Sequence, residues 1–221
     1  MAKTSSFEQY HRRYERWFTA HPDAYQSELL ALRALLPWRG LGLEIGVGSG
    51  RFAAPLGVPI GLDPSRAMLR YASRRGIHTV QGVAESLPFA EATFDYILVA
   101  TTICFVDDPA SMLREAWRVL RPQGSVCIGF IDRESSLGQT YLAQQPRSPF
   151  YRVATFYSAA EVFVFLRNAG FAESVCIQTL FDPPGGTTEI ESFRAGFGAG
   201  AFVVVRGAKD SSARPSPPRS Q

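Results

Sequence analysis

The chain has 221 residues, enough for one α/β domain with additions or at most two small domains, and its composition of 46% apolar and 19% charged residues is typical of a packed globular protein. The net charge is only +3 without a long basic run, which argues against a nucleic-acid partner. No stretch approaches the roughly 18 apolar residues of a membrane helix, no signal peptide opens the chain, and three scattered cysteines indicate neither a disulfide framework nor a zinc site. A cytoplasmic protein is the default expectation.

Two helices are predicted in front of the first strand. Residues 5–19 place five aromatic side chains at helical spacing: Phe7, Tyr10, Tyr14, Trp17 and Phe18. After a break at 21–23, a second helix runs from about residue 23 to 36, where Pro37 ends it. We expect residues 1–38 to form a helical cap on the core domain.

The core domain begins at residues 41–54, where an apolar strand runs into three glycines and then into the start of a helix. The glycines alternate with other residues at Gly46, Gly48 and Gly50. Glycine has no Cβ, so a ligand can approach the backbone closely, and the following helix presents free N–H groups at its positive end. The glycines alone are weak evidence for any particular ligand.

Downstream of the glycines, strands and helices alternate. Strands are predicted at 58–63, 77–81, 94–100, 125–131, 171–180 and 201–206, and helices at 64–75, 108–120 and 158–168. This alternation predicts a parallel sheet covered on both faces, and the last two strands, which no helix connects, are expected to pair antiparallel at an edge. Residues 208–221 are polar and proline-rich, so we predict a disordered tail after a single domain of residues 1–207.

An acidic residue, Asp63, ends the second predicted strand thirteen residues after Gly50. At that place a carboxylate can accept two hydrogen bonds from a ribose diol. An aspartate before a proline can also simply cap a helix. A dinucleotide fingerprint would carry its third glycine where Arg51 stands, and Glu44 is an unfavourable neighbour for a pyrophosphate. The pattern therefore disfavours NAD and suits a cationic ligand.

Four segments occur in a characteristic order and spacing between residues 41 and 131: LEIGVGSGRFA, GLDPSRAML, QGVAESLPFAEATFDYIL and MLREAWRVLRPQG. Together they resemble the class I S-adenosylmethionine-dependent methyltransferases, particularly the ubiquinone/menaquinone-methyltransferase-like group. The resemblance implies an α/β, Rossmann-like, doubly wound sheet of seven strands in the order 3-2-1-4-5-7-6, with strand seven antiparallel. It also implies S-adenosylmethionine as the cofactor, S-adenosylhomocysteine as the product, and no metal.

The resemblance assigns roles around the glycines and the second strand. Glu44 and the backbone at Gly46 and Gly48 would hold the methionine portion of the cofactor and its amino group. Asp63 would bind the ribose hydroxyls, and Pro64 would lie against the adenine.

Further along the chain the resemblance places Ala84 and Glu85 at the adenine edge and Thr101 on the methionine side. The sequence departs from the family pattern at Val83, because relatives commonly have an aspartate there that bonds the adenine amino group. Either Glu85 replaces that aspartate, or packing and backbone alone hold the adenine.

The acceptor side is less clearly marked in the sequence. The front helix either only packs on the core or also closes over the cofactor, and the long connections at 133–157 and 182–200 are expected near the acceptor. The candidate acceptor residues are Tyr10, Tyr14, Thr102, Phe105 and Tyr141. If the acceptor must lose a proton, the candidate bases are Tyr10, His11, Tyr14 and Asp132, none of which a motif marks.

These observations favour an S-adenosylmethionine-dependent methyltransferase that acts on a small molecule by in-line displacement, with neither a nucleic acid nor a membrane as partner. One alternative is a non-catalytic, nucleoside-binding regulatory protein of the same fold, since fold does not fix activity. The other is an NAD-dependent oxidoreductase, which the glycine spacing disfavours. The sequence does not indicate the oligomeric state.

Overall fold

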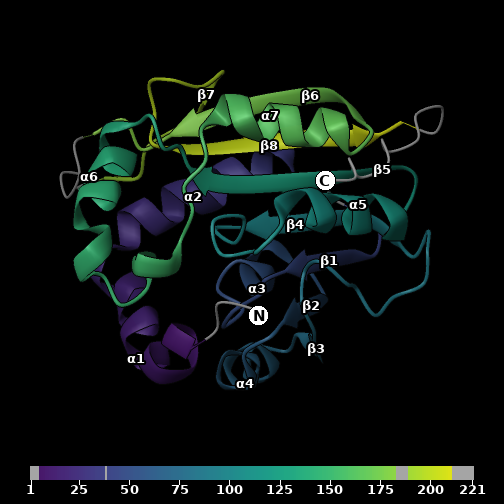
Figure 1. Cartoon of the computed structure of the whole chain (residues 1–221), viewed down its shortest axis with the longest axis horizontal. Coiled ribbons are helices and arrows are strands. Elements are labelled where there is room, and N and C mark those ends of the chain that lie inside the picture. Colours follow the sequence, from purple (N-terminus) through teal and green to yellow (C-terminus); the bar gives the residue numbers. More distant parts are fainter. Residues whose placement is uncertain (1–4, 38, 183–188, 211–221) are drawn as a thin grey trace, which may run out of the picture.

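A computed structural model describes residues 5–37, 39–182 and 189–210, in which one eight-stranded sheet carries helices on both faces (Figure 1). The helices are α1 (Ser5–Ala20), α2 (Pro22–Leu35), α3 (Ala53–Leu56), α4 (Arg66–Arg74), α5 (Pro109–Val119), α6 (Ser136–Gln144) and α7 (Ala159–Asn168). The strands are β1 (Gly42–Ile45), β2 (Ile60–Asp63), β3 (His78–Gln81), β4 (Phe94–Ala100), β5 (Leu120–Ile131), β6 (Phe171–Thr179), β7 (Arg194–Ala195) and β8 (Phe202–Lys209).

The strand order in the sheet is β3-β2-β1-β4-β5-β8-β6-β7. The first five strands pair in parallel, and β8 runs antiparallel to both β5 and β6. With β8 as the seventh predicted strand, the expected doubly wound α/β fold and its order are confirmed. The order reverses between β1 and β4, which is the switch point where ligands of open α/β sheets bind.

Two details of the predicted sheet were wrong. An additional short strand, β7, pairs antiparallel with Ile177 and Gln178 of β6, so the sheet has eight strands rather than seven. A two-residue strand leaves no periodicity in a sequence, because only its partner defines it. The last strand also continues to Lys209, whose Nζ donates to the carbonyl of Leu120 at 2.6 Å, so the predicted tail does not begin at residue 208. The rest of that tail, 211–221, lies outside the described residues.

The helix starts follow local capping chemistry. Ser158 and Glu161 form the predicted capping box at α7, and the side chain of Asp108 accepts the N–H of Ala110 at the start of α5. Pro64 was expected in the first turn of α4. Instead Ser65 is the N-cap, accepting the N–H of Met68 at 3.2 Å, so Pro64 precedes the helix and lies in the turn after β2.

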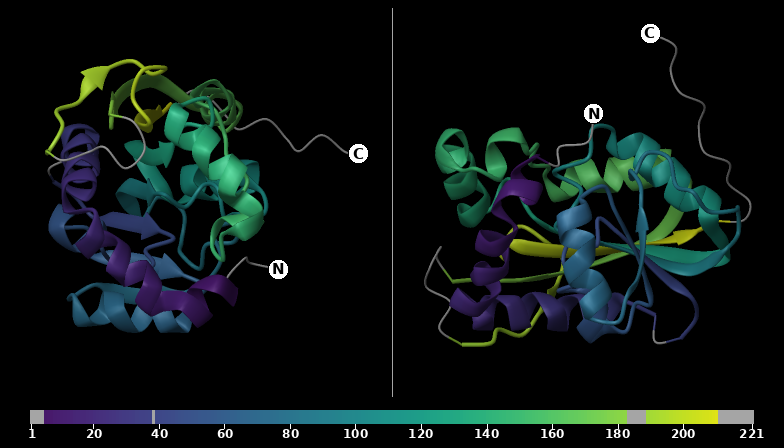
Figure 2. Two further views of the ribbon diagram at one scale, coloured as in Figure 1. Left: turned by 90° about the vertical axis from the view of Figure 1, so that its left-hand side faces the viewer. Right: turned by 90° about the horizontal axis from the view of Figure 1, so that it is seen from below.

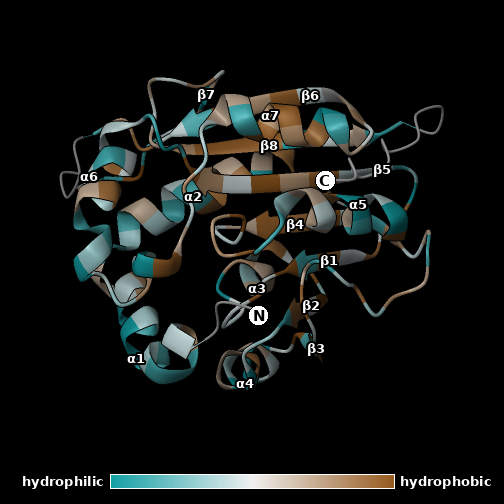
Figure 3. Ribbon diagram, in the orientation of Figure 1, coloured by the Kyte–Doolittle hydropathy of each residue, from teal (hydrophilic) through white to brown (hydrophobic). Residues whose placement is uncertain are grey.

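The core consists of two apolar layers, one on each face of the sheet. Alternate residues of β4 belong to different layers, with Ile97 and Val99 beneath α5 and α7 and Leu98 on the side of α2, α3 and α4. Figure 3 shows apolar strands between these helices. In the described part of the chain, no helix is both long and apolar enough to cross a membrane. The cytoplasmic location stays a prediction.

Helices α1 and α6 lie together at the end of the sheet where the parallel strands finish (Figures 1 and 2). The break between α1 and α2 falls at His21, as the sequence predicts, and Pro22 opens α2. The predicted long connection at 133–157 contains α6 and two short 3₁₀ turns, η1 (Gln145–Arg147) and η2 (Tyr151–Val153). The tertiary structure therefore covers one end of the sheet with segments from opposite ends of the chain.

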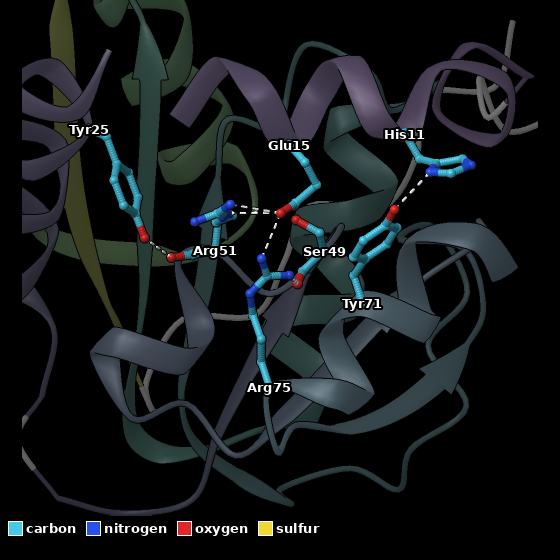
Figure 4. A network of polar contacts seen from close by, with 7 residues as sticks. All are labelled: His11, Glu15, Tyr25, Ser49, Arg51, Tyr71 and Arg75. Atoms are coloured by element: carbon cyan, nitrogen blue, oxygen red, sulfur yellow. Dashed lines mark hydrogen bonds and ion pairs between the residues drawn. The ribbon is translucent and has the colours of Figure 1, made fainter. Parts of the chain in front are cut away.

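Polar contacts fix α1 against the glycine loop and α4 (Figure 4). Glu15 Oε2 accepts from Arg51 Nη2 at 2.8 Å and from Arg75 Nη2 at 2.6 Å, while Arg75 also donates to the carbonyl of Ser49 at 2.7 Å. Near the start of α1, Glu8 accepts the N–H of Ala67 at 3.2 Å, at the positive end of α4. The helix is thus anchored at several points along its length.

We expect Glu15→Gln to lower the free energy of unfolding by about 1–3 kcal/mol at pH 7, because a partly buried charged hydrogen bond is lost and two guanidinium groups are left without their anion. Burial raises the pKa of Glu15, but hydrogen bonds from arginine outweigh this effect and hold the pKa below its usual value of 4.5. Its stabilisation is therefore present above pH 4.5 and is lost as the pH falls further. Denaturant unfolding at pH 7 and pH 3 measures the difference.

Arg121→Gln is the matched control, because Arg121 forms an ion pair with Asp95 at the surface, where 48% of the arginine side chain is accessible. We expect this substitution to change the free energy of unfolding by less than about 0.5 kcal/mol. Hydrogen exchange would show faster opening of residues 5–20 in the Glu15 variant only. Equal stability of the two variants would contradict this anchoring role.

Candidate functional site

Two adjoining cavities lie at the carboxyl ends of the parallel strands. A small cavity of about 100 Å³ is enclosed by the loops after β1, β2, β3 and β4, and a large one of about 560 Å³ lies beneath α1, α2 and α6. Four residues line both cavities: Phe7, Tyr14, Thr101 and Phe105. The geometry therefore places two chambers side by side, separated by a few shared side chains.

The glycine loop forms one wall of the small cavity. The N–H groups of Gly46 and Val47 donate to the carbonyl of Leu62 at 2.8 and 3.0 Å, which folds the loop over the end of β2. Gly46 has φ +71°, and a Cβ there would lie 2.2 Å from Cγ2 of Thr102. Gly48 has φ +51°, and a Cβ there would point into the cavity, 3.7 Å from the Tyr14 hydroxyl. The positive φ favours glycine at both positions, and the missing Cβ at Gly48 lets a ligand approach the backbone.

Asp63 links this loop to the next turn. Its Oδ2 accepts the N–H of Gly48 at 2.9 Å, and its Oδ1 accepts the N–H of Ser65 at 2.8 Å. Burial raises the pKa of Asp63 to about 6, although these two hydrogen bonds favour the charged form. The simpler alternative of a helix cap is only partly right, because Ser65 is the N-cap of α4. Each carboxylate oxygen can still accept a further hydrogen bond.

Glu44 lies behind the glycine loop and lines neither cavity. It is 1% exposed, and its carboxylate accepts the N–H of Ala53. Its Oε2 has no hydrogen-bond partner among the described residues. Burial raises the pKa of Glu44 well above its usual range. A buried carboxylate with an unused oxygen next to Gly46 fits a cationic ligand, but direct contact with that ligand stays a prediction.

The far wall of the small cavity comes from the segments after β3 and before α5. Val83, Ala84, Glu85 and Asp107 line it. One oxygen of Glu85 accepts the N–H of Asp107 at 2.7 Å, so this side chain anchors the neighbouring loop. In the part of the chain that the structure describes, its other oxygen has no hydrogen bond of this kind, so both alternatives raised by Val83 stay predictions.

Thr101 and Thr102 follow β4 at the boundary of the two cavities. Thr101 has φ +52°, a strained conformation for a β-branched residue, and its N–H donates to the carbonyl of Gly129 at 2.8 Å. The Thr102 hydroxyl donates to the carbonyls of Gly46, at 3.1 Å, and Ala100. Thr102 lines only the small cavity, so it supports the glycine loop rather than the acceptor side where the sequence placed it.

The structure brings together most of the predicted cofactor residues in the small cavity: Gly46, Gly48, Asp63, Pro64, Ala84, Glu85 and Thr101. Among the predicted acceptor residues, Tyr14 and Phe105 line both cavities and Tyr141 lines the large one. Tyr10 lines neither, since it sits at a kink in α1 with φ −112° and packs against Phe150.

Of the four candidate bases named from sequence, Tyr14 alone lines a cavity in the described part of the chain. His11 is hydrogen-bonded to the Tyr71 hydroxyl at 3.1 Å and Asp132 accepts the N–H of Glu134 at 2.9 Å; neither lines either cavity. Burial, reinforced by the nearby carboxylates, raises the pKa of Tyr14, so its hydroxyl stays protonated. Among the described residues, no group of His, Cys, Asp and Glu could hold a metal ion.

The large cavity is mainly aromatic, with Trp17, Phe18, Tyr141 and Tyr151 in its walls. It also contains a carboxyl group that sequence reasoning missed, that of Glu28 on α2, which is 4% exposed. Glu28 lies three residues after Tyr25 and four before Leu32, so helical spacing places it on the same face as these two side chains. A carboxylate on that face was the signal that could have identified it.

Comparisons with known proteins agree with this geometry. A family model described as a methyltransferase domain matches residues 43–128. A crystal structure from Thermotoga maritima, described as an S-adenosylmethionine-dependent methyltransferase and a possible histamine N-methyltransferase, is 48% identical, covers 93% of this chain and 98% of its own, and has a TM-score of 0.90. An uncharacterized protein from Methanocaldococcus jannaschii is 40% identical over 92% of this chain and 98% of its own length.

The resemblance to menaquinone methyltransferases is partial. A demethylmenaquinone methyltransferase from Roseiflexus castenholzii is 37% identical over 41% of this chain and 42% of its own length. The stronger likeness, to the Thermotoga structure, extends over nearly the whole of both chains. This chain therefore belongs to the S-adenosylmethionine-dependent methyltransferases.

Proposed function

We propose that this protein transfers the methyl group of S-adenosylmethionine to a small-molecule acceptor held in the large cavity. The observation that carries the proposal is the pair of adjoining cavities at the switch point of the sheet. A reaction between two bound molecules needs two neighbouring sites, and both must be shielded from water. Here the shared residues, Tyr14 and Phe105 among them, stand where the two molecules would meet.

The cofactor residues act by binding and alignment. Asp63 would accept the ribose hydroxyls, the backbone at Gly46 and Gly48 would hold the methionine portion, and Ala84 with Pro64 would border the adenine. The sulfonium supplies an activated methyl group for direct in-line displacement. The protein then has to bring the acceptor close in the correct direction, which is where much of the acceleration in such reactions arises.

Helix α1 would close the site. The small cavity is below the roughly 300 Å³ at the lower end of ligand pockets, and Phe7 and Tyr14 of α1 form part of its wall. We infer that α1 moves outward when the cofactor enters and returns to shield it. This supports the second alternative for the front helix, closure over the cofactor in addition to packing.

A small acceptor is supported by the large cavity, whose volume of about 560 Å³ is typical of sites for small molecules and whose walls are mostly apolar. Because the related Thermotoga structure is described as a possible histamine N-methyltransferase, amines form one acceptor class to test. The two other hypotheses have less support. A purely regulatory protein has no need of a second, adjoining chamber, and an NAD enzyme would conflict with the buried Glu44 behind the glycine loop.

Calorimetry with S-adenosylmethionine and with NADH tests the cofactor assignment. We expect micromolar or tighter binding of S-adenosylmethionine and no measurable binding of NADH, because the carboxyl group of Glu44 and the spacing of the glycines suit a cationic nucleoside better than a pyrophosphate. Release of S-adenosylhomocysteine in the presence of an acceptor library tests turnover. Binding of NADH alone would refute the proposal, and cofactor binding without any turnover would favour the regulatory alternative.

The affinity for S-adenosylhomocysteine is expected to rise up to about tenfold between pH 5 and pH 7, because the ribose hydroxyls require the ionised carboxylate of Asp63, whose pKa is raised to about 6 in the free protein. Asp63→Asn should remove this pH dependence and weaken binding at pH 7 by about 1.5–3 kcal/mol. Thermal unfolding of both proteins controls for loss of the loop contacts. A variant with wild-type affinity would place the ribose elsewhere.

Gly48→Ala tests the close approach of the ligand to the backbone. The left-handed φ of +51° costs alanine about 1–2 kcal/mol of stability, and the new methyl group would occupy the cavity. We expect the affinity for S-adenosylmethionine to fall at least about tenfold. Gly57→Ala is the matched control: it has a φ of +73°, its Cβ would meet nothing within 4 Å, and it should lose stability without losing affinity. Equal affinities in the two variants would argue against a ligand at Gly48.

A further inference from the structure

In the described part of the chain, the carboxyl group of Glu28 is buried without a partner in a chamber lined mainly by aromatic side chains. Its residue is 4% exposed, yet it lines the large cavity. Among the described residues, Glu28 has no hydrogen bond or ion pair through its side chain, and burial alone accounts for its altered acidity. Buried carboxyl groups are costly unless they are paired, so an unpaired one facing a cavity indicates a group that a ligand completes.

The groups around Glu28 are neutral in the interior and charged only at the cavity's exposed edge. The electrostatic influence of Glu28 reaches four phenols, those of Tyr14 on α1, Tyr25 on its own helix, Tyr141 on α6 and Tyr151 on η2. Burial raises the pKa of each of these phenols, so they remain uncharged near neutral pH. The cationic side chains that line the cavity, Arg13 and Arg147, are both exposed.

Aromatic faces add to the same preference. Trp17, Phe18 and Phe52 line the cavity together with three of these tyrosines, all but Tyr25. The faces of aromatic rings carry partial negative charge and attract cations, most strongly where water is excluded. A cavity with a carboxylate among aromatic rings therefore favours a ligand with a positively charged group, and the apolar part of that ligand can pack against the rings.

We propose that Glu28 is the recognition group for the methyl acceptor, and that the acceptor carries a protonated nitrogen which donates a hydrogen bond to this carboxylate. The inference rests on the proposed function and deepens it, since it gives the chemical class of the molecule in the large cavity: a small amine with an apolar or aromatic body. Glu28 acts as a specificity-determining residue. The methyl group goes to an atom that faces Tyr14 and Phe105 and has a free lone pair, and therefore not to the protonated nitrogen held by Glu28.

A measurable proton release follows from this arrangement. Burial raises the pKa of Glu28 to about 8 in the free protein, so most molecules hold the carboxylic acid at pH 7. When an ammonium group binds, the acid loses its proton to the buffer and the carboxylate pairs with the cation. The number of protons released per bound amine therefore equals the fraction of Glu28 that is protonated before binding.

Three probes of similar shape test the proposal at pH 7 on protein saturated with S-adenosylhomocysteine: phenethylamine, 2-phenylethanol and 3-phenylpropanoate. We expect phenethylamine to bind at least about tenfold more tightly than the other two probes, because only phenethylamine can form a hydrogen bond between charged groups with Glu28. Titrations in buffers of different ionisation enthalpy should show release of close to one proton per phenethylamine. These two measurements require only the wild-type protein.

Glu28→Gln keeps the shape of the side chain and removes the charge. In this variant the preference for phenethylamine should fall to about twofold or less and the proton release should disappear, while affinity for S-adenosylhomocysteine remains within about twofold of wild type. Arg147→Gln, which changes an exposed charge of the same cavity, should keep both the preference and the proton release.

The inference is overturned if wild type does not prefer phenethylamine, whether or not any probe binds, or if Glu28→Gln retains the preference. Tighter binding of 3-phenylpropanoate that Arg147→Gln abolishes would identify an anionic acceptor instead. The binding of S-adenosylhomocysteine separates the two levels of failure. If the wild-type protein binds it but shows no preference for the amine, only the role of Glu28 is wrong; if it does not bind it, the proposed function fails as well.

Discussion

The hydrogen bond from the Gly48 N–H to the buried carboxylate of Asp63 is the contact on which the site depends, because it fixes the end of β1 to the end of β2. The same carboxylate accepts the N–H of Ser65 and so sets the start of α4. Two strand ends and a helix start are thereby held around one acidic group. Burying a carboxylate is unfavourable unless donors surround it, and here backbone N–H groups supply them while further acceptor capacity remains for a ligand.

Helix α1 gives the site its enclosure. The ion pairs of Glu15 with Arg51 and Arg75 connect the helix to the glycine loop and to the end of α4, while Phe7 and Tyr14 form walls of both cavities. The side chains that anchor the helix are thus different from those that line the cavities. In the closed position the helix is therefore held by contacts that do not use its cavity-lining aromatic side chains.

Glu28 illustrates a local conflict between stability and recognition. Burial raises the pKa of Glu28 to about 8 in the folded protein, whereas the unfolded chain releases this proton near 4.5. The free energy of unfolding therefore falls as the pH rises between these two values. Such an arrangement persists in a folded protein most readily where a ligand uses it.

The sheet order was implied by the resemblance to a known family, while the sequence by itself determined the alternation of the main strands and helices and most of the small cavity. Those features arise from short segments, such as the strand, glycines and helix around Gly46 and Gly48, whose conformations depend on neighbouring residues. Asp63 was identifiable for the same reason, since it ends a strand beside that loop. Local chemistry at strand ends converges in space because parallel strands share one edge.

Only the tertiary structure decided the acceptor chamber. Its walls come from α1, α2, the segment after β4 and the connection containing α6, which are distant in sequence and meet only when the sheet is assembled. In the structure Glu85 accepts the N–H of Asp107, Tyr10 lines neither cavity, and Glu28 lines the large one. The direction in which a side chain on a helix points depends on how that helix packs, and packing is a property of the whole fold rather than of any one segment.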